Sequence, residues 1–477
     1  MSRTLLFLFC AGLAGTLSAC GGSGASSVSP PTANAPRAEN VAATTMAATT
    51  APYHIATWAF DEYWAPGATA TAAQVQKYIS YAEGGLGNSK ALTDCSGSTG
   101  CQSVFYVDPN FVYASTACAS QATLDVLAAA PETWYVHEAG YRDAAHRVHG
   151  DYSKTCNGSS VTVPVDLLND SSTAVQAYFR SFLRANADGW DDYFMDDTSG
   201  QVLTQMYGPG GGFCVDNPPN HYCTTSEELP SDATIVYDHA AFATAMTHTS
   251  GSAMNFFYNG LTFSAGAPSD LGVLSGSKHF VGVVCEDCIV NSGTFRPTMY
   301  NQVLTSMADI DAMSGAQFVE LNHGSSPAGS AAQISQRLVT TAIAWLGYSP
   351  GHTVVFADLE DNTENLAAWP EENIVPASPL QTMSGSTAAI EVASGVYRRE
   401  FSSCTNEGVA IGPCAAIVNA TGSAVKILSS WLHQSYGHVV TLSGGDVTQG
   451  GEVLLTSTTF SPNVTTVPAD QGLLISR

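Results

Sequence analysis

The sequence predicts an α/β fold in which a (β/α)8 TIM barrel over residues 53–375 is followed by a C-terminal all-β sandwich domain over residues 380–477. Two observations carry this prediction. Short apolar runs alternate with helical patterns along the first region, which is typical of parallel strands connected by helices. Beyond residue 380 the helical periodicity stops, and short strand-like runs are separated by Gly, Asn, Ser and Pro, as in antiparallel domains.

The first 52 residues are expected to lie outside both domains. Residues 1–20 combine Arg3, an apolar run and small residues before Cys20, which is typical of a secretory signal. The sequence Leu-Ser-Ala-Cys (17–20) resembles the bacterial lipobox, which implies lipidation of Cys20; an ordinary signal peptide is the alternative. Residues 21–52 contain almost no large apolar residue, so a flexible linker is expected there. The expected location is the bacterial cell envelope, either lipid-anchored in the outer membrane or secreted.

Charge and cysteine content support export. The formal net charge of −25 argues against nucleic acid or an anionic lipid surface as a partner, and favours a neutral or cationic substrate. Apart from Cys10 and Cys20, the cysteines fall as successive neighbours, and short loops close most easily. The predicted disulfides are Cys95–Cys101, Cys118–Cys156, Cys214–Cys223, Cys285–Cys288 and Cys404–Cys414. For Cys285 and Cys288, a redox or metal pair is the alternative.

Eight strands and their helices are predicted in chain order. The strands are expected at residues 54–60, 103–113, 134–140, 192–197, 253–261, 279–285, 316–322 and 352–359. Helices are expected at residues 72–82, 120–130, 172–187, 238–249, 300–313 and 331–346. The clearest helix is 172–187, where apolar residues recur at the spacing of one helix face. The absence of GxGxxG after the first strand weakens a dinucleotide-binding alternative.

The stretch 189–198 is the centre of the predicted barrel. Tyr193, Phe194 and Met195 form a short buried strand, and Asp196 and Asp197 follow at its carboxyl end. That end of a parallel strand is where ligands and catalytic groups lie in α/β folds. A simple strand-terminal turn is the alternative, since Asp-Asp-Thr-Ser-Gly is also favourable turn sequence.

Polar and aromatic side chains collect at the carboxyl ends of almost all predicted strands, and this predicts a binding site at the barrel mouth. The candidate substrate-binding residues are Trp58, Asp61, Tyr106, Asp108, His137, Asp197, Asn259, Glu320 and Asn322. Carboxylates and aromatic rings without an evident metal set suit glycoside chemistry, in which one acid protonates the leaving oxygen and a second carboxylate attacks or activates water. Neither a metal nor another cofactor is expected.

A family resemblance assigns the catalytic pair. The sequence Trp-Asp-Asp-Tyr-Phe-Met-Asp-Asp (190–197) resembles the fourth-strand signature of glycoside hydrolase barrels of the polygalactosaminidase-like and α-galactosidase-like groups, with Asp192 in place of the usual Gly. The runs 397–401 and 416–419 are similar to part of their C-terminal β domain. The resemblance implies that Asp196 is the nucleophile or electrostatic stabiliser and Glu286 the general acid/base. A one-residue error in register would substitute Asp197 and Glu320.

The expected function is therefore hydrolysis of a polysaccharide or oligosaccharide, with α-linked polymers as candidates. Two other hypotheses stay open. The first is a surface lipoprotein that binds glycan without cleaving it, since barrels host many functions. The second is a metal-dependent hydrolase that uses Asp196, Asp197, His323 and Asp358. Two carboxylates that face each other across the mouth would favour the glycosidase. The sequence does not indicate an oligomeric state.

Overall fold

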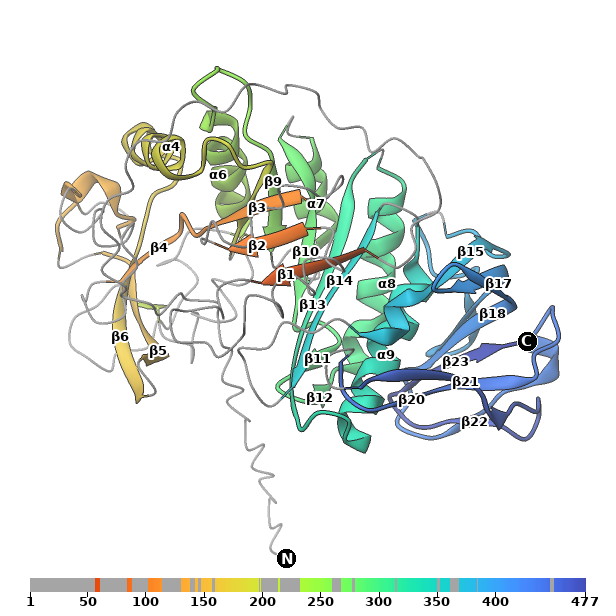
Figure 1. The fold of residues 1–477 in the computed structure, drawn as a ribbon. Helices are drawn as coiled ribbons and strands as arrows, with labels where there is room; N and C mark the ends of the chain where they lie inside the picture. Colours follow the sequence, from red (N-terminus) through yellow and green to blue (C-terminus); the bar gives the residue numbers. More distant parts are fainter. Residues whose placement is uncertain are drawn as a thin grey trace, which may run out of the picture.

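The structure is a computed structural model of the 477-residue chain. It describes residues 56–60, 84–87, 102–113, 130–137, 142–144, 147–156, 159–196, 198, 213–214, 232–259, 267–276, 279–313, 315–349, 352–360, 369–383, 385–446 and 450–477. Along these ranges an α/β barrel is followed by a C-terminal β domain (Figure 1). The signal and linker predicted for residues 1–52 lie outside the described residues.

Eight parallel strands form a closed ring in the order in which they occur along the chain. They are β1 (Ala56–Phe60), β2 (Gly84–Gly87), β3 (Gln102–Val107), β7 (Asp192–Met195), β9 (Phe256–Asn259), β10 (Phe280–Glu286), β13 (Gln317–Ser326) and β14 (Thr353–Glu360). Strand β14 pairs with β1 and so completes the ring. The carboxyl ends of all eight strands therefore lie at one mouth.

Five described helices follow strands of this ring. They are α4 (Thr173–Ala187), α6 (Asp232–Ala245), α7 (Ala267–Ser275), α8 (Pro297–Asp311) and α9 (Ala331–Gly347). Helix α4 is amphipathic and buries Val175, Phe179 and Leu183. Helix α9 begins at Ser330, whose side chain accepts the N–H of Gln333 and so caps the helix. The regions predicted as helices 72–82 and 120–130 lie outside the described residues, apart from Ala130.

The predicted strands agree with the structure except at the second and third positions. The first and the fourth to eighth coincide with strands of the ring. The strand predicted second, 103–113, contains β3, which is third in the ring, and the true second strand is β2. Its sequence Gly-Gly-Leu-Gly carries no apolar run that could indicate a strand. The strand predicted at 134–140 is wrong, because Trp134 closes a 3-10 helix, η2 (Glu132–Trp134), and the described residues after it make only isolated bridges.

The chain between β3 and α6 contributes a small antiparallel sheet that the sequence analysis did not predict. Its strands are β4 (Phe111–Tyr113), β5 (His149–Cys156), β6 (Ser159–Leu167) and β8 (Phe213–Cys214), in the order β4-β6-β5-β8. Figure 1 shows β4, β5 and β6 on the side of the barrel opposite the C-terminal domain. We refer to this sheet as the β3 insert, because it begins directly after the carboxyl end of β3.

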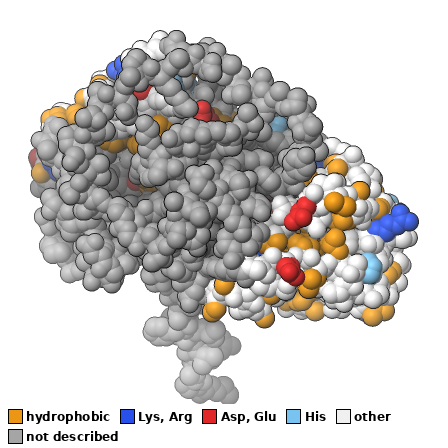
Figure 2. All heavy atoms as spheres, in the orientation of Figure 1, with side chains coloured by type: hydrophobic (Ala, Val, Ile, Leu, Met, Phe, Trp, Pro, Cys, Tyr) orange, Lys and Arg blue, Asp and Glu red, His pale blue; other side chains and the backbone are white. Residues whose placement is uncertain are grey.

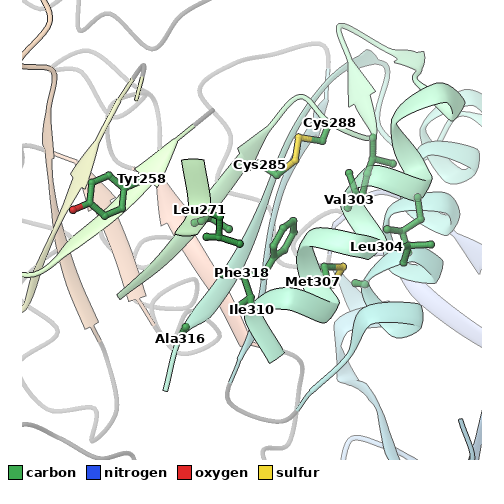
Figure 3. Packing of buried hydrophobic residues seen from close by; sticks show 14 of the residues in the cluster. Tyr258, Leu271, Cys285, Cys288, Val303, Leu304, Met307, Ile310, Ala316 and Phe318 are labelled. Atoms are coloured by element: carbon green, nitrogen blue, oxygen red, sulfur yellow. A yellow bond between two sulfur atoms is a disulfide. The ribbon is translucent and has the colours of Figure 1, made fainter. Parts of the chain in front are cut away.

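Alternation along the barrel strands separates two apolar cores. The inner core fills the barrel and consists of Val104, Phe194, Phe257, Val284, Val319 and Leu321. The intervening residues lie between the strands and the surrounding helices. In Figure 3, Phe318 lies among Leu271, Met307 and Ile310 in this outer layer, close to the disulfide between Cys285 and Cys288.

The C-terminal domain is built on one seven-stranded antiparallel sheet. Its strands are β15 (Ile374–Pro379), β16 (Glu391–Ala393), β17 (Val396–Asn406), β18 (Val409–Asn419), β20 (His438–Ser443), β21 (Glu452–Thr459) and β23 (Gly472–Ser476). An apolar cluster separate from the two barrel cores lies between the sheet and a two-stranded ribbon of β19 (Val425–Lys426) and β22 (Thr466–Val467). The predicted sandwich is thus one large sheet with a small second layer. Figure 2 shows few charged side chains on the visible face of this domain.

The large sheet packs against helix α9 of the barrel. Gly472 lies so close to the helix that a Cβ atom there would come within 2.7 Å of the Ala342 side chain. The guanidinium of Arg399 donates to the carbonyl oxygens of Leu346 and Tyr348 at the end of the helix. The two domains therefore share a packed and hydrogen-bonded interface.

Two of the five predicted disulfides, Cys285–Cys288 and Cys404–Cys414, are present. Each of the other three predicted pairs includes a cysteine outside the described residues. Among the residues that the structure describes, no helix is both long and apolar enough to span a membrane.

Candidate active site

A layer of polar side chains caps the inner core at the barrel mouth. On each of four neighbouring strands, a polar residue follows an inner-core residue by two positions, so its side chain points to the same face of the strand. Tyr106 follows Val104, Asp196 follows Phe194, Asn259 follows Phe257, and Glu286 follows Val284. The four strands β3, β7, β9 and β10 are adjacent in the ring, so these side chains meet.

Asp196 is buried and held from three directions. The hydroxyl of Tyr106 donates to its Oδ2 at 2.7 Å, and the Asn259 amide donates to its Oδ1 at 2.8 Å. The Asn110 side-chain amide donates to its main-chain carbonyl at 3.1 Å. The two donors to the carboxylate, the Tyr106 hydroxyl and the Asn259 amide, are neutral groups that orient it.

Asn259 links Asp196 to Glu286. Its Nδ2 lies 2.8 Å from Oδ1 of Asp196 and 2.6 Å from Oε2 of Glu286. An amide NH₂ carries two hydrogens, so it can donate one to each carboxylate. The two carboxylate oxygens are therefore at most about 5.4 Å apart, which is the sum of the two distances. Both acids therefore lie at the mouth, one on each side of the Asn259 amide.

The turn after β10 fixes the position of Glu286. The Cys285–Cys288 disulfide closes it, and the main chain at Asp287 is left-handed, with φ +55°. The Asp287 N–H donates to the carbonyl of Leu321 at 2.6 Å, and Arg296 donates to the Asp287 carbonyl at 2.8 Å. Glu286 thus lies at the end of β10, directly before a turn that a disulfide and two hydrogen bonds of its main chain hold in place.

A second layer behind Asp196 was missed by the sequence analysis. Asn110 lies just beyond β3, and its Oδ1 is 2.5 Å from Nε2 of His239 on helix α6. Because the Asn110 amide nitrogen faces Asp196, Oδ1 must accept and His239 Nε2 must carry the proton. His239 is fully buried, and burial lowers its pKa to about 4, against a hydrogen bond with the Thr198 backbone that raises it. The ring is therefore neutral at physiological pH.

A buried carboxyl lies beside this histidine. Oδ2 of Asp170 is 3.5 Å from His239 Nε2, farther than the Asn110 oxygen. Burial raises the pKa of Asp170 well above its usual range, and the charges of Asp238 and Asp108 add to the effect. No sequence signal indicated these residues, because Asn110 and His239 are 129 positions apart and belong to no common motif.

Three of the candidate substrate-binding residues lie away from the mouth. Glu320 and Asn322 alternate with the inner-core residues Val319 and Leu321, so their side chains face the outer layer. Oδ1 of Asn322 accepts the N–H groups of Ile289 and Val290, which supports the turn after Glu286.

His137 belongs to the region of the β3 insert and contacts Glu132 at 2.8 Å. Arg147 pairs with the same carboxylate and with Asp166. These contacts lower the pKa of Glu132 to about 2, with the Arg147 hydrogen bond as the largest cause. His137 therefore belongs to an ion-pair network, and not to the end of a barrel strand.

The remaining candidates are described in part or not at all. Asp108 follows Tyr106 on the same face and accepts the N–H of Asn110 at 2.9 Å. Asp61, Asp197 and Cys20 lie outside the described residues, and only the backbone of Trp58 is described. The metal-site hypothesis rests on Asp197 and on the side chains of His323 and Asp358, which are also outside the description. Among the described side chains, no group of three or more His, Cys, Asp or Glu is placed to hold a metal ion.

Two aromatic residues near the predicted strand ends, Trp134 and Tyr258, belong to the core. Tyr258 is fully buried in the outer layer, and Trp134 packs against Tyr178 of helix α4. Tyr106, in contrast, stacks on Phe194 inside the barrel and directs its hydroxyl to Asp196. Of the aromatic residues that the structure describes, Tyr106 is thus the one in contact with a mouth carboxylate.

No protein-family model and no curated protein match the chain. Its structural neighbours include polysaccharide-acting glycoside hydrolases. A pullulanase from Anoxybacillus sp. LM18-11, complexed with maltotriose, is 9% identical with a TM-score of 0.36; the match covers 81% of this chain and 54% of the pullulanase. An α-amylase from Geobacillus thermoleovorans, complexed with acarbose, is 8% identical with a TM-score of 0.29, over 84% and 80% of the two chains.

A GH30 endoxylanase from Clostridium papyrosolvens C71 is 10% identical with a TM-score of 0.27, over 68% of this chain and 75% of the xylanase. This chain thus spans about half the length of the pullulanase. Likenesses this distant carry no argument about activity, which has to be inferred from the contacts at the mouth.

Proposed function

We propose that this chain is a retaining glycoside hydrolase in which Asp196 is the nucleophile and Glu286 the general acid/base. The observation that carries the proposal is the single amide nitrogen of Asn259, which donates to both carboxylates at 2.8 and 2.6 Å. The two distances place the nearest oxygens of the carboxyl groups no more than about 5.4 Å apart, and this close approach favours the ~5–5.5 Å separation of carboxyl groups in retaining enzymes over the ~6.5–9.5 Å of inverting ones.

The surroundings of the two carboxylates suit different roles. Asp196 is 2% exposed and accepts hydrogen bonds on both oxygens, which stabilises the ionised form that a nucleophile needs. Glu286 is partly exposed at the end of β10, where it can reach a leaving-group oxygen and then a water molecule. In this arrangement, Asn259 holds the carboxyl groups of Asp196 and Glu286 close together.

The reaction follows in two balanced steps. Asp196 attacks the anomeric carbon while the glycosidic bond breaks, and the proton of Glu286 passes to the departing oxygen. A covalent glycosyl ester on Asp196 results, and Glu286 is left ionised. Glu286 then takes a proton from water, the resulting oxygen attacks the anomeric carbon, and the ester bond to Asp196 breaks. Both carboxyl groups return to their starting forms.

The proposed substrate is a polysaccharide or oligosaccharide, with α-linked polymers as the first candidates. We also propose that the protein acts at the cell envelope, tethered through a lipid on Cys20 and the segment 21–52. Labelling of cells with a radioactive fatty acid tests the anchor. The wild type should incorporate the label and Cys20→Ser should not; equal labelling would contradict the anchor.

Hydrolysis of a panel of α-linked galactosamine, galactose and glucose polymers tests the activity. Wild type is compared with Asp196→Asn and Glu286→Gln, and Asp188→Asn serves as the matched control because that residue lies at the end of helix α4. Both site variants should lose at least about 100-fold in kcat, while circular dichroism and the control stay unchanged. Binding without turnover by the wild type would support a glycan-binding protein and contradict the enzyme.

A further inference from the structure

We propose that His239 is a positioning residue that acts on Asp196 through Asn110. The inference rests on the proposed function, because it concerns the geometry of the nucleophile. His239 belongs to helix α6 on the outside of the barrel; its Nε2 contacts the Asn110 side chain, and the ring also has a hydrogen bond with the Thr198 backbone. Its contribution would be to hold the Asn110 amide in one orientation.

Asn110 uses all four of its polar groups at the carboxyl end of β3. Its N–H donates to Asp108 Oδ1, and its carbonyl accepts the N–H of Leu168. Its Nδ2 donates to the main-chain carbonyl of Asp196, and its Oδ1 faces Nε2 of His239 at 2.5 Å. Asn110 is 2% exposed, so a lost partner would not be replaced readily by solvent.

The Asn110 side-chain amide has an acceptor oxygen and a donor nitrogen, so its orientation depends on the group that each of them faces. If the amide rotated by half a turn, its oxygen would face the carbonyl oxygen of Asp196, and two acceptors would repel each other. The N–H of His239 prevents this rotation, since it needs an acceptor opposite it. His239 thus selects the orientation in which Asn110 donates to Asp196.

The segment that Asn110 holds carries the nucleophile. The N–H of Asp196 donates to the carbonyl of Val107 at the end of β3, and its carbonyl accepts from Asn110. Two residues further on, the N–H and hydroxyl of Thr198 both donate to the carbonyl of Asn259 on β9. A shift at Asp196 would therefore change its position relative to the amide that it shares with Glu286.

Two substitutions of equal length separate the hydrogen bond from packing. His239→Gln keeps an N–H donor at the end of the side chain, whereas His239→Met fills similar space without a donor. We expect His239→Met to lower kcat by about 10- to 100-fold with KM unchanged, because small displacements of a reacting group have effects of this size. His239→Gln should stay within about threefold of the wild type. Equal kcat for the two variants would overturn the inference.

Chemical rescue distinguishes positioning of Asp196 from a general structural effect. In Asp196→Gly, azide can enter and attack the anomeric carbon in place of the carboxylate. If His239 acts through Asp196, then His239→Met should lower the azide-dependent rate of this variant no more than His239→Gln does. A penalty of the same size as in the wild-type background would contradict the proposal.

A measurement that needs no substrate keeps this inference separate from the proposed function. Hydrogen–deuterium exchange of the full-length protein is followed in a peptide that contains residues 192–198, with residues 414–418 in the C-terminal sheet as the control. His239→Met should exchange faster than His239→Gln in the first peptide only. An equal rate in the two variants would overturn the positioning role, whether or not the wild type hydrolyses a glycoside. Absence of turnover together with the expected exchange difference would contradict the glycosidase alone.

Discussion

Two carboxylate centres in this chain have different kinds of hydrogen-bond donors. One is Glu400 in the C-terminal sheet, and the other is the pair Asp196 and Glu286 at the barrel mouth. Glu400, on strand β17 of the C-terminal sheet, accepts from the Arg398 guanidinium, the Nδ1 and main-chain N–H of His433, and the Tyr436 hydroxyl. At the barrel mouth, Asp196 and Glu286 both accept from the Asn259 amide, and Asp196 also accepts from the Tyr106 phenol and, at its main-chain carbonyl, from the Asn110 amide. Glu400 therefore has the Arg398 cation among its several donors, whereas Asp196 and Glu286 share the Asn259 amide as a donor.

The difference indicates which centre is structural and which is suited to react. Burial alone would raise the pKa of Glu400, but the hydrogen bonds from His433 and Tyr436 and the charge of Arg398 lower it below its ordinary value. Such a group is fixed in its ionised form. The donor that the two mouth carboxyl groups share is a neutral amide, which holds them without adding a positive charge.

Substitution of Arg337 is expected to have the largest effect on the free energy of unfolding. Its guanidinium donates to both carboxylate oxygens of Glu371, at 2.8 and 2.6 Å, and to the carbonyls of Gly444 and Gly445. Arg337→Ala should lower the free energy of unfolding by about 3–5 kcal/mol, because it leaves a buried carboxylate unpaired. Urea denaturation measures this loss. The double variant Arg337→Ala, Glu371→Ala should recover part of it, and a loss below about 1 kcal/mol would contradict the pair's role at the domain interface.

Asn259 offers the corresponding test at the mouth. Asn259→Leu keeps similar volume but removes the donor shared by Asp196 and Glu286, so kcat should fall by about 100-fold while the melting temperature changes little. Steady-state kinetics and thermal denaturation are measured on the same samples. Asn255→Leu, just before the same strand, is the matched control. A wild-type kcat in Asn259→Leu would mean that the shared amide does not organise the carboxylates.

Glu400 and Glu320, a buried carboxyl group on β13, should make contributions to the free energy of unfolding that change with pH in opposite directions. The lowered pKa of Glu400 means that its contribution is present above the unfolded value of about 4.5 and is lost as pH falls through the folded value. Glu400→Gln should therefore lower the unfolding free energy by about 1.5–3 kcal/mol at pH 7, and by less at pH 3–4. Urea titrations at both pH values measure this, and a pH-independent difference would contradict it.

Glu320 should show a pH dependence of the opposite sign. It is 1% exposed in the outer layer, and neither of its carboxyl oxygens has a hydrogen-bond partner among the described residues. Burial raises the pKa of Glu320 well above the usual range. The folded state then loses stability as pH rises above the unfolded value, by about 1.4 kcal/mol per unit until the folded pKa is reached. Glu320→Gln should be more stable than wild type at pH 8, and the gain should vanish near pH 4. A destabilised variant at pH 8 would indicate an ionised, partnered carboxylate.

The barrel was predictable where apolar strands are bounded by polar residues. The strand at Tyr193–Met195 and its successors carry that signal, whereas Gly84–Gly87 carries none. Strand ends also predicted Asp196, Asn259 and Glu286 at the mouth. The same reasoning selected Glu320, because proximity to a strand end does not say which face a side chain occupies. Val319 and Leu321, the inner-core neighbours of Glu320, contain that information in their alternation.

The second layer was not predictable from local pattern. Asn110 and His239 are brought together by the pairing of β3 with β7 and by the packing of α6, and neither residue belongs to a periodic or spaced motif. The bridging role of Asn259 depends likewise on the order of β7, β9 and β10 in the ring. Long-range pairings of this kind follow from topology, which a single sequence specifies only through the complete fold.

The stereochemistry of hydrolysis tests the central claim most directly. Proton nuclear magnetic resonance identifies the first hemiacetal released from the best substrate of the panel, before mutarotation mixes the anomers. Asp196 and Glu286 are held within about 5.4 Å at their nearest oxygens, so the account predicts a product with the same anomeric configuration as the substrate. A first product of inverted configuration would contradict Asp196 as the nucleophile.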